Sequence, residues 1–498
     1  MRRGALLALL VGLTLPFLGK PVHLDDANFL ALAQGVRQDF WRPHAVRINW
    51  QGTTERAFDV LSNPPGIAWW LAPVLDAPVW AMHLWMLLWL PLAVWGAYRL
   101  SRALTGRGEA GVVLLCGAPI AVLASQSLMP DLPLLACTLA GLGGLVTARP
   151  GRRWPWALLA GSAALFRYSG VALIPLAVAW PMLHRDPRGA LRCGLAAAVP
   201  IGLLTLHDLH AYGQSHLLAM IDFQGVSDTP GAVAAKLVAA LGALGGAAAL
   251  PVLCWRRPVR AGAGFVLGAA AGGALGQSGL PLVGTVLAVG AGGAVLAAAL
   301  RREDVRSVWL ACWLVGGLVF LLKLRFTAAR YWMPFFAPAV LLLLRDAPAR
   351  LLRIAVVTTP ALSLLLALDD LELARAQRQA ADRVIAMGTG LFVGHWGWQH
   401  HLEAAGWQAL DEDASVPSGV LLARSAVAWP QEPAPSCTEP VADFTIPDAW
   451  PGPRIHTAQG AANLHAFLIA GQPPIPAYAP WGIGRDPQES VTVVRGCD

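Results

Sequence analysis

Apolar stretches of 15 to 25 residues recur along the chain from Ala5 to Leu368, and short polar segments separate them. A helix needs about 20 predominantly apolar residues to cross the hydrocarbon core of a bilayer. The pattern therefore predicts one polytopic all-α membrane domain with about thirteen transmembrane helices. The predicted spans are 4–20, 79–98, 109–126, 131–148, 154–166, 169–183, 191–206, 232–254, 260–276, 280–299, 307–322, 331–344 and 351–368.

The composition supports the same class of protein. The 498 residues are 56% hydrophobic and 13% charged, with a mean hydropathy of +0.53. Domains that fold in water usually carry about 25% charged residues. These values exclude a soluble globule, an intrinsically disordered chain and a small disulfide scaffold.

The net charge of +7 comes largely from short basic clusters between the apolar stretches. Lys and Arg accumulate in the cytoplasmic loops of membrane proteins. We therefore expect these clusters and the N-terminus to be cytoplasmic and the C-terminus to lie outside, with no nucleic-acid partner. The clusters are Arg99, Arg102 and Arg107; Arg149, Arg152 and Arg153; Arg185, Arg188 and Arg192; Arg256, Arg257 and Arg260; Arg301, Arg302 and Arg306; and Arg345, Arg350 and Arg353.

The first apolar stretch has a second interpretation, because signal peptides are also short and apolar. It lacks a small-residue cleavage site before Lys20 and Pro21. We therefore treat it as a retained first span.

The composition changes at residue 369. The last 130 residues hold 15 of the 30 acidic residues and 13 of the 38 prolines. We predict a membrane domain at 1–368, with a long first outward loop at 21–78, and a small extracytoplasmic α/β domain at 369–498. Within that domain the pattern predicts helices at 374–387 and 399–405 and strands at 391–393 and 419–423.

Only two of the seven cysteines, Cys437 and Cys497, lie in this exported domain. An oxidising compartment favours disulfides, so we predict that these two cysteines are joined. The alternative is a frayed C-terminus, because chain ends are often poorly ordered.

Asp25 and Asp26 follow the first span directly. Adjacent carboxylates at a membrane exit can act as a general base and its partner, or as cation ligands. They can equally cap the helix predicted at 27–38, because Asp is favoured at helix N-termini. A third carboxylate, Asp131, stands at the mouth of a span in the next outward turn, with no basic neighbour in sequence.

Several cations are expected on the same side of the membrane. Lys323, Arg325 and Arg330 cluster near a late outward turn, and Arg167 with Tyr168 interrupts a span at similar depth. An Arg side chain can bind a phosphate through two parallel hydrogen bonds. Snorkelling toward the interface is the alternative, above all for Lys323.

Another outward loop carries three histidines and two carboxylates. Their spacing matches no standard metal site, so we expect a surface or substrate-loop role for them. These residues are His207, Asp208, His210, His216 and Asp222.

In combination, four features resemble the GT-C glycosyltransferases. They are the acidic pair after the first span, the long first outward loop, the Pro-Asp-x-Pro turn at Asp131 and the Arg-Tyr-x-x-Pro turn at Arg330. Within that group, the chain resembles the bacterial branch related to protein O-mannosyltransferases and the lipid A aminoarabinose transferase. The likeness extends over residues 1 to about 345.

The resemblance implies a glycosyltransferase of the bacterial inner membrane. It would move a sugar from a polyprenyl-phosphate donor to a lipid, glycan or protein acceptor, with inversion. Asp25 matches the catalytic base, Asp26 the second acidic position, and Asp131 a carboxylate facing the same cavity. Arg330 and Tyr331 match a turn near the donor phosphate. A divalent cation is compatible with this chemistry, but the resemblance does not identify its ligands.

A transporter or flippase of envelope lipids is the second hypothesis. Transporters commonly have inverted repeats and broken helices with ionisable residues at mid-membrane. Here the two halves of the chain do not resemble each other, and the ionisable residues outside the basic clusters concentrate in outward loops. A third hypothesis, a scaffold for envelope assembly, has support from the C-terminal domain alone.

Overall fold

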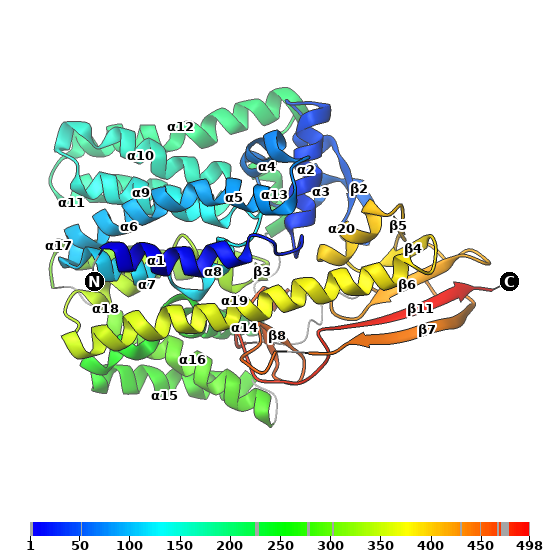
Figure 1. Ribbon diagram of the computed structural model, residues 1–498. Coiled ribbons are helices and arrows are strands. Elements are labelled where there is room, and N and C mark those ends of the chain that lie inside the picture. Colours follow the sequence, from blue (N-terminus) through cyan, green and yellow to red (C-terminus); the bar gives the residue numbers. More distant parts are fainter. Residues whose placement is uncertain are drawn as a thin grey trace.

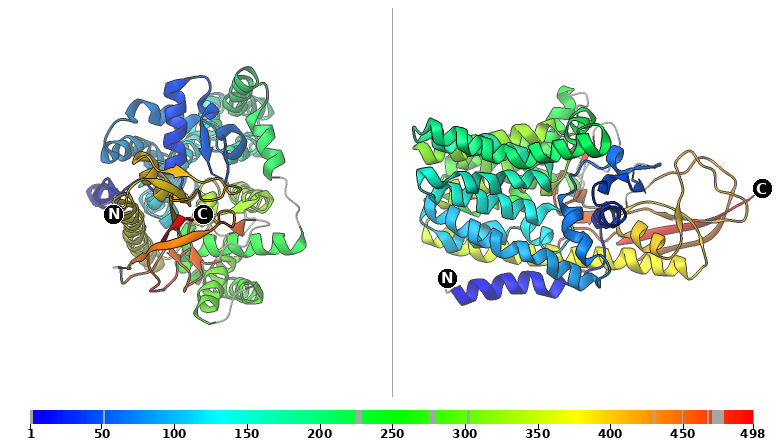
Figure 2. Two further views of the ribbon diagram at one scale, coloured as in Figure 1. Left: turned by 90° about the vertical axis from the view of Figure 1, so that its right-hand side faces the viewer. Right: turned by 90° about the horizontal axis from the view of Figure 1, so that it is seen from above.

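Helices lie side by side at one end of the molecule, and a β-sheet occupies the other end (Figure 1). This computed structural model describes residues 3–50, 52–224, 229–275, 279–300, 303–428, 431–448, 450–465, 468–469 and 478–497. The N-terminus lies at the helical end and the C-terminus beyond the sheet. Figure 2 shows the same division from two further directions. We call the helical end the bundle and residues 386–497 the tail.

Neighbouring helices of the bundle approach each other closely where small residues face one another. A Cβ atom added at Gly96 would lie 2.2 Å from the backbone nitrogen of Ala140, and one at Gly141 would lie 2.5 Å from that of Ala160. Close approach of this kind is typical of helices that pack within a bilayer. The bundle helices are α1 (Arg3–Thr14), α5 (Val79–Met86), α6 (Leu90–Thr105), α7 (Gly108–Cys116), α8 (Pro119–Ala124), α9 (Asp131–Thr147), α10 (Trp154–Gly161), α11 (Leu173–Leu183), α12 (Pro187–Tyr212), α14 (Pro230–Ala243), α15 (Pro258–Leu275), α16 (Leu280–Ala299), α17 (Val305–Lys323), α18 (Ala337–Leu344) and α19 (Ala349–Ile385).

Helix α12 shows the outer surface of the bundle. Leu191, Leu195, Leu203 and Leu206 recur on it at helical spacing, and each is 62 to 64% exposed. A continuous apolar row of this kind marks contact with lipid or a partner. In the described part of the chain, six helical segments are long and apolar enough to cross a membrane, so the chain is a multi-pass membrane protein. They are Val79–Thr105, Pro187–Tyr212, Pro230–Ala248, Leu282–Ala299, Val305–Lys323 and Ala349–Ile385.

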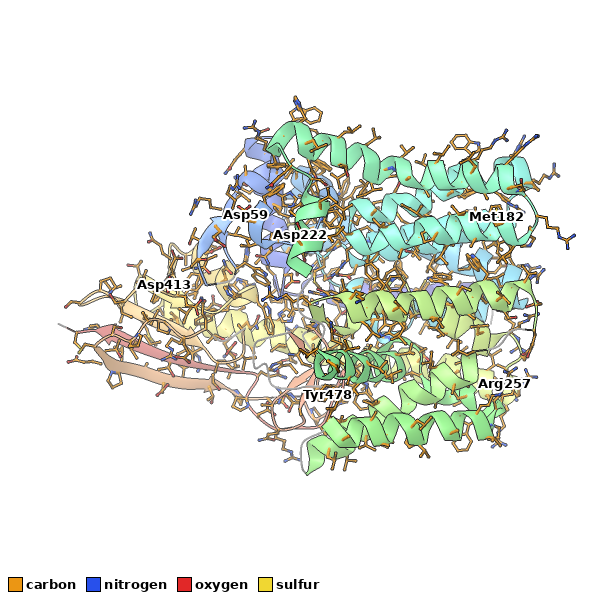
Figure 3. All side chains as sticks on the ribbon, turned by 180° about the vertical axis from the view of Figure 1, so that it is seen from behind. Asp59, Met182, Asp222, Arg257, Asp413 and Tyr478 are labelled. Atoms are coloured by element: carbon orange, nitrogen blue, oxygen red, sulfur yellow. A yellow bond between two sulfur atoms is a disulfide. The ribbon has the colours of Figure 1, made fainter. Side chains whose placement is uncertain are left out.

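The apolar helices Leu6–Phe17, Asp131–Thr147 and Tyr168–Leu183 are shorter. Thirteen crossings therefore stay a prediction. Residues of the predicted cytoplasmic loops and of the predicted outward loops lie at opposite ends of the bundle (Figure 3). Arg257, from one of the basic clusters, lies at the end away from the tail, and Asp59 and Asp222 lie at the end nearer to Asp413 of the tail. The orientation of these ends in a membrane is also a prediction.

Helix α19 is longer than the span predicted for it. Its 37 residues extend about 55 Å at the usual rise per residue, whereas the hydrocarbon core of a bilayer is about 30 Å thick. The helix continues past Leu368 and includes most of the helix predicted at 374–387, so the two predicted elements are one. Asp369 and Asp370 lie inside it, buried and paired with basic side chains, and the chain therefore need not leave the helix there.

The first outward loop is folded against the tail. Its elements are α2 (Asp26–Gln38), β1 (Arg47–Asn49), β2 (Thr54–Arg56), α3 (Ala57–Val60) and α4 (Gly66–Leu71), and α13 (His216–Gln224) follows α12. Asn49 Nδ2 and Thr54 Oγ1 both donate hydrogen bonds to Asp411 Oδ1, each over 2.9 Å. These bonds connect the β1–β2 hairpin with the tail.

The tail contains a five-stranded sheet in the order β5-β4-β6-β11-β7. Strand β4 is parallel to β5 and β6, whereas β11 is antiparallel to β6 and β7. Helix α20 (Trp396–Ala404) packs against α19 and α2. The strands are β4 (Gly390–Val393), β5 (Gln408–Ala409), β6 (Leu421–Ser425), β7 (Thr438–Ile446), β8 (His456–Thr457), β9 (Ala462–Asn463), β10 (Leu468–Ile469) and β11 (Glu489–Gly496).

The tail also reaches into the bundle. Strand β10 pairs antiparallel with β3 (Phe326–Thr327), in the segment between α17 and α18. Ala329 N donates to Leu464 O over 3.2 Å just beyond this pair. Buried apolar side chains of the bundle, the first loop and the tail form one continuous core. The tail is therefore packed onto the bundle, and its position is fixed by direct contacts.

Cys437 and Cys497 form a disulfide in the structure, with Cα atoms 5.2 Å apart. Gly496 at the end of β11 pairs with Thr438 of β7, and Cys497 N donates to Cys437 O over 3.1 Å. Strand pairing therefore holds the C-terminal residues in place, which explains why the penultimate residue can form a stable cross-link.

We expect mass spectrometry of the non-reduced protein, digested after thiol alkylation, to find one linked peptide containing Cys437 and Cys497. The chain-entropy model gives a stabilisation of roughly 4 kcal/mol for a closed loop of this length, so the double Ser variant should have a lower unfolding temperature. Two separately alkylated peptides would show that the bond is absent. The buried Cys137 is the control and should appear as a free thiol.

Candidate active site

Asp25 lies in the turn between the first helix and α2. Leu24, just before it, has a φ of 51° in the left-handed region, which costs an ordinary residue roughly 1–2 kcal/mol. Asp25 occupies the N-cap position of α2, but its side chain makes no capping hydrogen bond. Its carboxylate forms an ion pair with Arg330 Nη2, 305 residues away in sequence. The turn thus directs Asp25 toward the bundle, and the capping interpretation does not hold for this side chain.

Arg330 lies in the 3-10 helix η10 (Ala329–Trp332), directly after β3. Its Nη1 donates to Met129 Sδ over 2.9 Å, in the turn that leads into α9. Its Nε is buried and has no hydrogen-bond partner among the described residues. The guanidinium therefore has donor capacity beyond its pair with Asp25.

Asp131, the first residue of α9, forms a second ion pair. Its Oδ1 lies 2.7 Å from Arg167 Nη1, and both side chains are largely buried. Arg167 is in an extended link between η6 (Ser162–Leu165) and η7 (Tyr168–Ala172), which explains the interruption of the apolar pattern there. Asp131 Oδ2 is buried with no hydrogen-bond partner in the described chain. A tertiary partner, Arg167, thus stabilises the carboxylate that has no basic neighbour in sequence.

The ring of Tyr331 joins the two ion pairs. Its centroid is 4.5 Å from Arg167 Cζ and 5.9 Å from Arg330 Cζ. Both distances are within the range of a cation–π interaction. The structure therefore brings five of the predicted site residues into one group: Asp25, Asp131, Arg167, Arg330 and Tyr331.

A small cavity adjoins this group. Its volume is about 10 Å³, which is about the space that one water molecule needs. Any larger ligand therefore requires the lining side chains to separate. The lining combines apolar residues of α8 with charged residues and two residues of the tail: Ile120, Leu123, Ala124, Met129, Asp131, Arg330, Leu464 and His465.

Asp26 has a different environment from Asp25. Its Oδ1 accepts a hydrogen bond from Leu128 N over 2.8 Å, and its Oδ2 accepts one from His23 N over 3.3 Å. Burial raises the pKa of Asp26 to about 7, and the nearby Lys20 opposes this rise. Asp26 thus connects the first outward segment with the turn before Asp131.

Lys323 and Arg325 lie apart from the cavity lining. Lys323 is the exposed last residue of α17, and Arg325 is half-buried in the link to β3. Their assignment to a donor phosphate remains a prediction.

The histidine-rich outward loop is partly buried against the first outward loop. The His216 and His44 rings lie 4.7 Å apart, and Tyr168 Oη is 2.8 Å from His216 Nδ1. Asp208 Oδ2 accepts a hydrogen bond from His216 N over 3.3 Å. His210 and Asp222 are exposed. Among the described residues, this loop brings no metal-ligating group together.

One group of side chains in the described chain can hold a metal ion, and sequence reasoning did not identify it. It consists of His23, Asp370 and His465, all buried. Burial lowers the pKa of His465, although its hydrogen bond to Asp370 opposes this effect. A signal did exist in the sequence, because Asp369 and Asp370 form an acidic pair at the end of an apolar stretch, as Asp25 and Asp26 do.

No family model matches the sequence, and no curated protein does. Among solved structures, the chain is similar to ArnT from Cupriavidus metallidurans bound to undecaprenyl phosphate. That match has 14% identity and a TM-score of 0.41, and covers 85% of this chain and 92% of that one. ArnT from the same organism in the apo state matches with 14% identity and a TM-score of 0.37, over 80% and 84% of the two chains.

We expect the Asp131–Arg167 pair to behave as a coupled unit in unfolding experiments. Asp131→Asn or Arg167→Met alone leaves a buried charge without its partner, which commonly costs about 3–5 kcal/mol. The double variant should lose much less than the sum of the two, because no charge is then unpaired. Unfolding of the purified protein in detergent micelles measures these differences. The exposed pair of Arg56 and Asp59 is the control, and its removal should change the stability by less than about 1 kcal/mol.

Proposed function

We propose that the chain is a membrane glycosyltransferase of the GT-C type that uses a polyprenyl-phosphate sugar as donor. The sugar would pass to an acceptor on the outer side of the bacterial inner membrane, with Asp25 as the general base. The observation that carries this proposal is the meeting of two Asp–Arg pairs over one tyrosine ring beside a partly apolar cavity.

The donor side of the reaction needs a cation beside an apolar surface. A lipid chain favours the apolar helices of the bundle, and its phosphate favours a guanidinium that can donate two hydrogen bonds. The guanidinium groups of Arg330 and Arg167 both lie near the Tyr331 ring, and apolar residues of α8 line the cavity together with Arg330. This combination favours a lipid phosphate over a soluble nucleotide as the donor.

The acceptor side needs a base. In the proposed step, the Asp25 carboxylate takes the proton of an acceptor hydroxyl, and the acceptor oxygen forms a bond to the anomeric carbon. The bond from that carbon to the phosphate oxygen breaks, and polyprenyl phosphate leaves with the electron pair. A single base opposite the leaving group gives inversion. The two arginines stabilise the negative charge that develops on the phosphate.

Binding of the donor would also release the base. Asp25 and Arg330 neutralise each other while the cavity is closed. A phosphate that accepts hydrogen bonds from Arg330 competes with Asp25 for the same guanidinium. Asp25 then becomes available to the acceptor only when the donor is in place. Asp26, whose oxygens accept hydrogen bonds from two backbone N–H groups, would position this turn.

Asp25→Asn should abolish sugar transfer while the fold is retained, because the amide has nearly the same shape and cannot accept the proton. Loss of a general base commonly lowers the rate by about 10²- to 10⁴-fold. The assay uses the purified protein in proteoliposomes, a polyprenyl-phosphate sugar labelled in the sugar, and an envelope extract from a strain that lacks the gene. Transfer of label to any acceptor is the readout.

The matched control is Asp59→Asn, an exposed carboxylate of the same outward loop, which should retain full activity. Activity of Asp25→Asn within a few-fold of the unaltered protein would assign the base to another residue, with Asp131 next. Movement of intact donor across the membrane without any transfer of label would favour the transporter hypothesis.

Arg330→Ala should weaken the binding of polyprenyl phosphate, and Arg330→Lys should restore only part of it, because a point charge cannot reproduce the planar guanidinium. Native mass spectrometry of the protein with added polyprenyl phosphate measures the bound fraction. Arg56→Ala, at an exposed position, serves as the control. Unchanged binding in Arg330→Ala would assign the phosphate to Arg325 or Arg167.

A further inference from the structure

Three segments that are distant in sequence bring a histidine, an aspartate and a second histidine together. His23 precedes the Asp25 turn, Asp370 lies within α19, and His465 follows β9 in the tail. Asp370 Oδ1 lies 3.3 Å from His23 Nε2 and 3.2 Å from His465 Nε2. The three side chains are at most 6% exposed, and their ligand atoms all lie within 4.8 Å of one another.

These separations fit the ligands of one metal ion. A tetrahedral zinc ion has bonds of about 2.0–2.1 Å to nitrogen and oxygen ligands. Two ligand atoms at such a tetrahedron then lie roughly 3.3 Å apart. Both separations from Asp370 Oδ1 match this edge length, and only the two histidine nitrogens would need to adjust.

The partners of His23 point to a cation in the same place. His23 Nδ1 lies 3.2 Å from Gln377 Oε1, an oxygen that can only accept, so with the Gln377 amide in this orientation Nδ1 carries the hydrogen. In the neutral ring, Nε2 then has a lone pair, which is directed at a carboxylate oxygen. In this tautomer His23 Nε2 donates no hydrogen bond, and its nearest polar neighbour is Asp370 Oδ1 at 3.3 Å. A metal ion between His23 Nε2 and Asp370 Oδ1 removes the repulsion between their lone pairs. A metal-ligating histidine usually donates its other ring N–H to an acceptor, as His23 does here to Gln377.

Lys20 pairs with only one oxygen of Asp370, so the other oxygen, Oδ1, remains available to a metal ion. Its Nζ lies 2.7 Å from Asp370 Oδ2, the oxygen that neither histidine approaches. The ammonium group therefore fixes the orientation of the carboxylate and neutralises it when no metal is bound.

We propose that His23, Asp370 and His465 bind a zinc ion that fastens the tail to the first outward loop and α19. Two imidazoles and one carboxylate favour zinc over magnesium or calcium, which prefer oxygen ligands. Three protein ligands leave a fourth position for water. Because His465 also lines the cavity beside Asp131 and Arg330, the metal would hold one wall of the proposed active site in place.

Metal content tests the proposal directly and independently of sugar transfer. The full chain, without an affinity tag, is treated with a chelator, incubated with zinc and freed of excess metal. We expect one zinc ion per chain by elemental mass spectrometry. Loss of groups that only support a metal ligand commonly weakens affinity 10- to 100-fold, so His465→Ala should weaken it by more than about 100-fold. His210→Ala, at an exposed histidine, is the control and should bind as before.

A second variant keeps the test informative if His465→Ala fails to fold. His465→Cys retains a ligand at the same position. Loaded with cobalt in place of zinc, it should gain a sulfur-to-cobalt charge-transfer band that the unaltered protein lacks. Absence of this band in a folded His465→Cys variant, or absence of stoichiometric zinc in the unaltered protein, would overturn the proposal. The cluster would then be a hydrogen-bonded network around Asp370. Neither result depends on whether the chain transfers sugar.

Discussion

Four carboxylates at the junction of the bundle and the tail form ion pairs with basic side chains, and these pairs bring distant parts of the chain together. An ionised group removed from water costs several kcal/mol unless a partner compensates it. The partner comes from another segment in every case, so the ion pairs also connect segments. The pairs are Asp25 with Arg330, Asp131 with Arg167, Asp370 with Lys20, and Asp369 with Arg454.

Helix α19 is the element on which the first loop and the tail converge. Asp370 faces Lys20 and His23 of the first outward segment and His465 of the tail. Asp369 accepts hydrogen bonds from Ile455 N over 2.6 Å and from Gln488 Nε2 over 2.9 Å. Asp369 and Asp370, which are adjacent in α19, thus contact both the first outward segment and the tail. The tail reaches the cavity because these contacts hold it there.

The same arrangement links stability with the proposed chemistry. Asp25 and Arg330 neutralise each other in the closed cavity. A lipid phosphate would replace the carboxylate on Arg330 and leave Asp25 free to act as a base. Tyr331 contacts both arginines, so the two guanidinium groups would remain beside each other when the carboxylates separate from them.

The sequence by itself determined the membrane class of the protein, most of its helices and the residue types of the candidate site, because apolar periodicity and the cost of exposed charge act locally along the chain. Asp25, Asp131, Arg167 and Arg330 could each be selected as charges near the ends of apolar stretches. Only the tertiary structure decided which carboxylate pairs with which arginine, because the partners are up to 305 residues apart. It also decided that Asp26 binds backbone groups, that α19 continues through Asp369, and that His465 of the tail joins the site. These outcomes depend on packing between distant segments, and no local pattern encodes them.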